Sequence, residues 1–180
     1  MAASDLFWFD RCARRVLAEP VIRRLPDLRG LPVRIQEADG LRHERGPVHA
    51  GSFLRERRIA FDCTRSEFPR IFTHELAHFV WLRLGNRRRL EYEEIVRREL
   101  LAGARGELGW SAERRKRVLP AVAWQERRRA WREYCCESFC DSAAWLWSGV
   151  RNHAEFTLAI RYRKLRAAWF ARETAGPLSI

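Results

Sequence analysis

Apolar residues recur along this chain with two different periods, and the change between them divides the sequence into three parts. Over residues 5–19 they return every three or four positions, which predicts an amphipathic helix that ends before Pro20. Between residues 26 and 62 short apolar runs are separated by turn signals at Asp39-Gly40, Gly46-Pro47 and Gly51-Ser52. From residue 64 onward the spacing is that of helices.

The middle part predicts strands over the runs 31–38, 47–54 and 57–63. Apolar residues occupy alternate positions in the first and last of them, namely Val33, Ile35, Ile59 and Phe61. This alternation indicates a small, largely antiparallel sheet of about three strands.

The last part predicts five helices. Thr64 and Glu67 form a plausible capping box for a helix over about 65–84, which Gly85 ends. A second helix covers 90–104, where Glu93 and Glu94 precede Arg97 and Arg98 by four residues. Ser111 could cap a short third helix closed by Pro120. The last two cover about 121–147 and 153–173.

The economical interpretation is one α+β domain over 1–180, with the small antiparallel sheet packed on a zincin-like helical bundle. It divides into an N-terminal helix (1–25), the sheet (26–63), helices (64–148) that include an Arg-rich interval (86–130), and a C-terminal helix (150–175). Spacing along the helices assigns one set of aromatic residues to the core: Phe72, Phe79, Trp81, Trp124, Trp131, Trp145 and Trp147. On the final helix Phe156, Ile160, Leu165 and Trp169 form an apolar stripe that would cover the domain or a partner.

Composition restricts the environment in which the protein works. No stretch approaches 18 uncharged apolar residues, so we expect no membrane span. The N-terminus has no apolar run before a small-residue cleavage site, and a secretory signal is not expected. The five cysteines, Cys12, Cys63, Cys135, Cys136 and Cys140, show no disulfide-scaffold spacing, which favours a reducing cytoplasm.

The net charge of +12 comes from 33 Arg and only two Lys. Basic residues cluster at 87–89, 114–117 and 127–129, all of them Arg except Lys116, and such a field attracts anionic partners, nucleic acid included. Acidic residues lie near these clusters, as on solvated helix faces, and no known nucleic-acid-binding motif is present. A basic nucleic-acid-binding protein with a structural metal remains one hypothesis.

The strongest chemical signal is His74-Glu75-Leu76-Ala77-His78 inside a predicted helix. Residues four apart share a helix face, so both imidazoles can reach one ion. Glu75 is rotated by about 100° from His74 and can act as general base for a metal-bound water. From this composition the HExxH pattern is expected only about 0.013 times by chance.

A catalytic zinc site needs a third protein ligand. Glu137 is the better candidate, because Asp141 lies one turn later and could accept the N–H of a ligand His. Glu133 could instead ligate with Glu137 behind it, and Glu93, Glu94 and Glu99 lie nearer in sequence to the His pair. Cys136 and Cys140 also share a helix face as potential ligands, although buried thiols are the simpler interpretation.

The chain here resembles the gluzincin zinc metallopeptidases, and residues 137–146 are similar to the signature of the ImmA/IrrE-like (minigluzincin) family. The signature Phe is Ala143 in this chain, and no helix-turn-helix domain is evident. The resemblance implies Zn²⁺ held by His74, His78 and Glu137, with Glu75 as base and Asp141 behind a His ligand.

We therefore expect a cytoplasmic, zinc-dependent metallopeptidase that acts on a peptide or protein substrate. The alternative within this family is a zinc-binding regulatory or protein-interaction module with little turnover. Tyr92, Tyr134, His153 and Tyr162 are candidates for stabilising the oxyanion. The strand over 57–63 is expected to offer the edge on which an extended peptide pairs.

Overall fold

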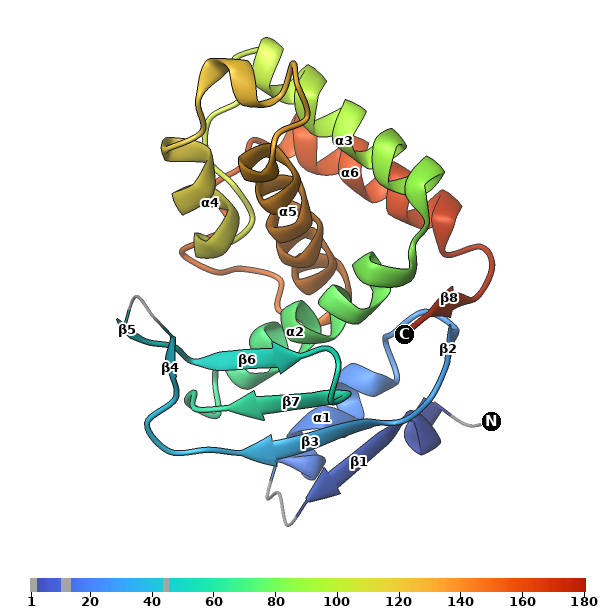
Figure 1. The fold of residues 1–180 in the computed structure, drawn as a ribbon. Coiled ribbons are helices and arrows are strands. Elements are labelled where there is room, and N and C mark those ends of the chain that lie inside the picture. Colours follow the sequence, from blue (N-terminus) through green and yellow to red (C-terminus); the bar gives the residue numbers. More distant parts are fainter. Residues whose placement is uncertain (1–2, 11–13, 44–45) are drawn as a thin grey trace.

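The computed structural model describes residues 3–10, 14–43 and 46–180 (Figure 1). The helices are α1 (Arg15–Ile22), α2 (Phe68–Arg83), α3 (Asn86–Leu101), α4 (Trp110–Arg117), α5 (Arg129–Trp147) and α6 (Ile160–Glu173), with short 3₁₀ turns at Ala3–Leu6 and Ala121–Ala123. The strands are β1 (Phe7–Asp10), β2 (Leu28–Arg29), β3 (Val33–Glu37), β4 (Arg42–His43), β5 (Gly46–Pro47), β6 (Ala50–Phe53), β7 (Arg58–Phe61) and β8 (Leu178–Ser179).

The α+β class is confirmed, but the expected antiparallel arrangement of the sheet is wrong. The main sheet has the order β1-β3-β7-β6; β1 pairs with β3 and β3 with β7 in parallel, and only β6 and β7 are antiparallel. A parallel pairing needs a crossover between strands, and here α1 provides it between β1 and β3. The strand over 57–63 is therefore interior, and β6 is the edge strand beside α2.

The predicted helix over 5–19 is wrong in its first half. Residues 7–10 form β1, whose Phe-Trp-Phe run suits a strand, and α1 begins only at Arg15 and includes Pro20. Cys12 and the rest of 11–13 lie outside the described residues.

The other helices exist as predicted, with shifted ends. The capping box of α2 is absent: Thr64 Oγ1 lies 3.0 Å from Ser66 Oγ, and Glu67 instead pairs with Arg70 and His153. On α4 Gly109, not Ser111, is the N-cap. The expected helices over 121–147 and 153–173 begin later, at Arg129 and Ile160.

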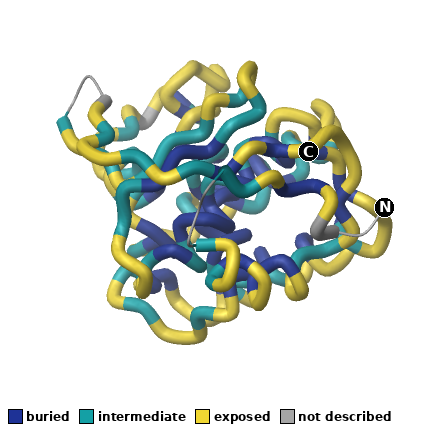
Figure 2. Tube along the Cα trace, turned by 90° about the horizontal axis from the view of Figure 1, so that it is seen from below, coloured by how far each residue is buried: buried dark blue, intermediate teal, exposed yellow. Residues whose placement is uncertain are grey.

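The helices α3 to α6 form a layer above the sheet, and α2 lies between that layer and the strands (Figure 1). Buried segments run through the middle of the molecule and exposed ones around it (Figure 2). Phe72, Phe79, Trp131 and Trp147 are buried as expected, and Trp81, Trp124 and Trp145 are partly buried. The predicted stripe on α6 is only half right, because Ile160 and Leu165 are exposed.

The helix α5 also packs on a buried ion cluster, which it contacts through Tyr134 and Ser142. Arg166 of α6 is fully buried and donates to the carboxylates of Glu99 and Glu107. Tyr134 donates to Glu107 (2.5 Å), and Ser142 lies 3.3 Å from Arg166.

Within the part of the chain that the structure describes, no helix is apolar and long enough to cross a membrane.

Candidate metal centre

Two histidines project from the same face of α2, one turn apart. The ring centroids of His74 and His78 are 5.0 Å apart. Both apolar residues between them, Leu76 and Ala77, are buried, so the opposite side of the helix packs into the core. The HExxH motif therefore has the local geometry that its spacing predicts.

The facing helix α5 brings Glu137 and Asp141 to His74, although 62 residues lie between His74 and Glu137 in the sequence. Glu137 Oε2 lies 3.3 Å from His74 Nε2, and Asp141 Oδ1 lies 2.7 Å from His74 Nδ1. The side chains of His74 and Glu137 are 11% and 13% exposed, so the site is mostly shielded from water while remaining accessible. An Nδ1–H donated to Asp141 leaves Nε2 directed at Glu137, as for a metal ligand with an orienting carboxylate behind it.

The electrostatics of this group favour charged side chains. Burial alone would lower the pKa of His74, but Asp141 and Glu137 outweigh it and raise this pKa well above 6.5. Burial would raise the pKa of Glu137, yet His74, His78 and Arg115 together lower it to about 2. At neutral pH a proton on His74 occupies a position that a cation would otherwise fill.

His78 has sulfur neighbours where His74 has a carboxylate. Its Nδ1 lies 3.4 Å from Cys140 Sγ and 3.5 Å from Cys136 Sγ. Burial lowers the pKa of His78, but Cys136 and Glu137 outweigh it and raise this pKa to about 9. One ligand atom from each of His74, His78 and Cys140 lies within 4.8 Å of the other two, which makes this trio a potential metal-binding group among the described residues.

The expected general base is held by the edge strand. Ser52 of β6 places its hydroxyl 2.5 Å from Glu75 Oε2 and 2.8 Å from the main-chain oxygen of Glu75. Sequence reasoning missed this serine, because only the packing of β6 on α2 gives it a role. Glu75 is therefore fixed beside the histidines and next to the strand edge.

The helix α4, within the Arg-rich interval, packs against Asp141 and Glu137. Ala112 at the start of α4 donates its N–H to Asp141 Oδ2 (3.0 Å), and Gly109 lies so close that a Cβ there would fall 2.2 Å from the same carboxylate. Arg115 Nη2 lies 3.0 Å from Glu137 Oε1. Gly109 carried no sequence signal, and Arg115 carried only its membership of the basic cluster at 114–117.

The residues named as oxyanion donors are engaged elsewhere. Tyr134 bonds to Glu107, and Tyr92 bonds to Ser138 and Ser142; both tyrosines are buried. Tyr162 donates to the carbonyl of Ala102, and His153 lies 3.2 Å from Glu67. Because these four side chains form hydrogen bonds elsewhere, the donor to an oxyanion beside the site must be another residue.

The alternative carboxylates are also engaged away from the histidines. Glu133 pairs with Arg129, Glu93 with Arg127, Glu94 with Arg97 and Arg98, and Glu99 with Arg166. Most basic residues of the clusters at 114–117 and 127–129 have acidic partners, which reduces the free positive charge available to a nucleic acid.

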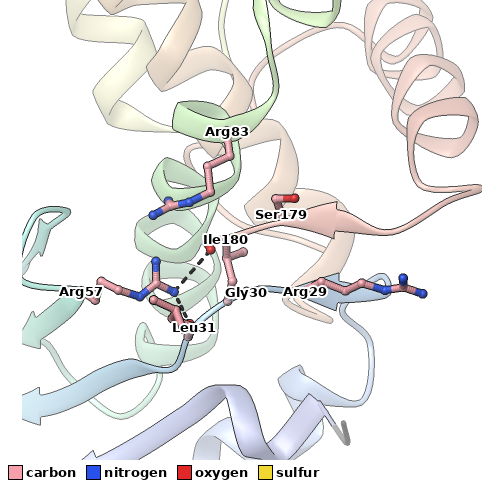
Figure 3. Close-up of a pocket in the computed structure, with 7 residues that line it drawn as sticks. All are labelled: Arg29, Gly30, Leu31, Arg57, Arg83, Ser179 and Ile180. Atoms are coloured by element: carbon pink, nitrogen blue, oxygen red, sulfur yellow. Dashed lines mark hydrogen bonds between the residues drawn. The ribbon is translucent and has the colours of Figure 1, made fainter.

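An open depression of about 390 Å³ lies at the other end of α2, around Arg57, Arg83 and Ile180 (Figure 3). Its polar groups bond to the chain itself, since Arg57 donates to the carbonyls of Leu31 and Ile180 and Arg83 to that of Phe79. It contains none of the residues predicted for the metal site.

Comparison of the chain with protein-family models, with curated proteins and with solved structures found no match. Its function is therefore inferred from its own residues and their geometry.

Proposed function

We propose that the protein is a zinc-dependent peptidase of the gluzincin type, with His74, His78 and Glu137 as the metal ligands. The observation that carries this proposal is the placement of Glu137 Oε2 at 3.3 Å from His74 Nε2, with Asp141 on the opposite ring nitrogen. Two imidazoles and one carboxylate, with acceptors behind the imidazoles, are a donor set that suits Zn²⁺.

When bound, Zn²⁺ would lower the pKa of a water molecule and polarise a peptide carbonyl. Glu75 would accept the proton of that water and return it to the leaving amine. Ser52 holds the Glu75 carboxylate ready for this role, and Asp141 and the cysteines orient the two imidazoles.

The substrate would lie along β6 rather than along the strand over 57–63. An edge strand presents unpaired N–H and C=O groups, to which an extended peptide can add as another strand. β6 is the edge of the sheet and carries Ser52, so a peptide paired there would pass beside Glu75.

A second candidate function rests on Cys140. If its sulfur joined His74, His78 and Glu137 around one ion, the site would have four protein ligands and would be closed, as structural zinc sites are. The protein would then be a zinc-binding interaction module without turnover. Both sulfurs lie at Nδ1 of His78, and a hydrogen bond at that nitrogen would leave Nε2 free for the metal, which favours an orienting role for the cysteines.

Metal content and peptide hydrolysis, measured on matched variants, test the proposal. Glu137→Gln should lower zinc affinity about 100-fold, whereas Glu133→Gln, one turn earlier on the same helix and exposed, should bind one zinc per chain like the wild type. Glu75→Gln should retain the zinc and the fold but lose hydrolysis of a fluorescent casein by at least a factor of about 100.

The two candidate functions give different results in the same experiments. Stoichiometric zinc without casein hydrolysis, together with a thiolate-to-metal charge-transfer band in the cobalt protein, would support the closed module. Equal zinc binding by wild type and Glu137→Gln would refute the peptidase site.

A further inference from the structure

We propose that Arg115 is the residue that binds the substrate oxygen on which negative charge develops, so that the site accepts ligands with an anionic oxygen next to the metal. This inference rests on the proposed function. It assigns the donor that the four sequence candidates do not provide, because their hydrogen bonds are formed elsewhere in the fold.

The packing of α4 on α5 determines where Arg115 lies. Ala112 is fully buried and donates its main-chain N–H to Asp141, which fixes the start of α4 on α5. Arg115 comes one turn later on α4, and Glu137 lies one turn before Asp141 on α5. This register places the guanidinium of Arg115 over Glu137 rather than in the solvent.

Arg115 is held in this position by one ion pair and one hydrogen bond. Its Nη2 lies 3.0 Å from Glu137 Oε1, and its Nη1 donates to the carbonyl of Ser111 at 3.2 Å. The other oxygen of Glu137, Oε2, faces His74. The guanidinium therefore lies at the rim of the predicted metal position, and a metal bound by Glu137 would compete with Arg115 for the charge of that carboxylate.

The exposure of Arg115 fits a residue that meets a ligand. Its side chain is 29% exposed, against 13% for Glu137, so it lies between the buried ligand group and the solvent. Guanidinium N–H groups bind carboxylate and phosphate oxygens strongly because the charge assists the hydrogen bonds. A donor aimed at the oxygen of a polarised carbonyl performs the same role in peptide hydrolysis.

Anion binding to the cobalt-loaded protein tests this proposal without a known substrate. The visible bands of Co²⁺ respond only to anions that reach the metal, so inorganic phosphate can be titrated despite the other arginines. We expect a shift of these bands in the wild type, and a half-saturating phosphate concentration about tenfold higher or more in Arg115→Gln. Arg114→Gln, its exposed neighbour, should behave like the wild type.

Two further measurements separate ligand binding from folding. Arg115→Lys keeps the charge and should restore part of the phosphate affinity, while acetohydroxamate, which chelates the metal directly, should bind all variants within about twofold. Equal phosphate affinity in Arg115→Gln and wild type would overturn the proposal, as would phosphate that never shifts the wild-type bands. Failure of the wild type to bind cobalt would instead refute the proposed function, and the role of Arg115 with it.

Discussion

Gly109 allows a sharp test of how the site is built, because it contributes no ligand and no side chain. Its φ of −178° is extended backbone, so alanine is tolerated by the main chain. A Cβ at this position would lie 2.2 Å from Asp141 Oδ1 and 2.5 Å from Oδ2. The three nearest atoms all belong to the carboxyl group of Asp141, so Gly109→Ala acts first of all by displacing that carboxylate.

The size of the effect follows from these distances. Ordinary contact begins near 3.4 Å, so the carboxylate must move by about 1 Å. Its bond to His74 Nδ1 is now 2.7 Å and would lengthen beyond hydrogen-bond range. Loss of such an orienting partner lowers metal affinity by about 10- to 100-fold, and overpacking should cost about 1–3 kcal/mol in the free energy of unfolding.

Competition with a chromogenic chelator gives the zinc affinity, and thermal unfolding gives the stability. Gly176→Ala is the matched control, since a Cβ there meets nothing within 4 Å and the residue needs no positive φ. The double variant Gly109→Ala/Asp141→Asn should bind zinc no more weakly than Asp141→Asn alone, because both changes remove one interaction. Zinc binding by Gly109→Ala within twofold of the wild type would refute this reasoning.

Three further predictions concern the rest of the site and its support. Arg166→Met should lower the free energy of unfolding by about 3–5 kcal/mol, because Glu99 and Glu107 stay buried without their cation. Thermal unfolding measures this loss, with Lys164→Met, a change at an exposed position of the same helix, as the control. Equal stability of the two variants would contradict the prediction. Zinc affinity should rise by up to about 100-fold per pH unit from pH 7 to 8, because the pKa of His78 is raised to about 9 and that of His74 well above 6.5, and zinc must displace a proton from each ring; an affinity independent of pH in this range would argue against the raised pKa values. Ser52→Ala should retain zinc but slow casein hydrolysis about tenfold, since Glu75 loses the hydroxyl that holds it; an unchanged rate would remove Ser52 from the mechanism.

Local patterns predicted the parts of this protein whose geometry is local. The spacing of four residues sets both His74 and His78 on one face of α2, and the same spacing pairs Glu137 with Asp141 on α5. The presence of Asp141 within an apolar helix segment correctly indicated a buried and satisfied carboxylate.

The remaining features depend on which segments meet in three dimensions. Strand direction was wrong because alternation along β3 and β7 is the same for parallel and antiparallel partners. The Phe-Trp-Phe run of β1 fits a helix or a strand, and only its pairing with β3 decides between them. Ser52, Gly109 and Arg115 have their roles solely through contacts with α2 and α5, so no pattern near them in the sequence could reveal those roles.

X-ray absorption spectroscopy of the zinc-loaded protein tests the central claim most directly, because it separates sulfur from nitrogen and oxygen around the ion. We predict one zinc per chain with nitrogen and oxygen neighbours at about 2.0–2.2 Å and imidazole scattering from two histidines. The Glu137→Gln protein, whose zinc affinity should be about 100-fold lower, should show a weaker signal of this kind at equal zinc concentration. A sulfur neighbour at about 2.3 Å would contradict the ligand set of His74, His78 and Glu137 and assign Cys140 to the metal instead.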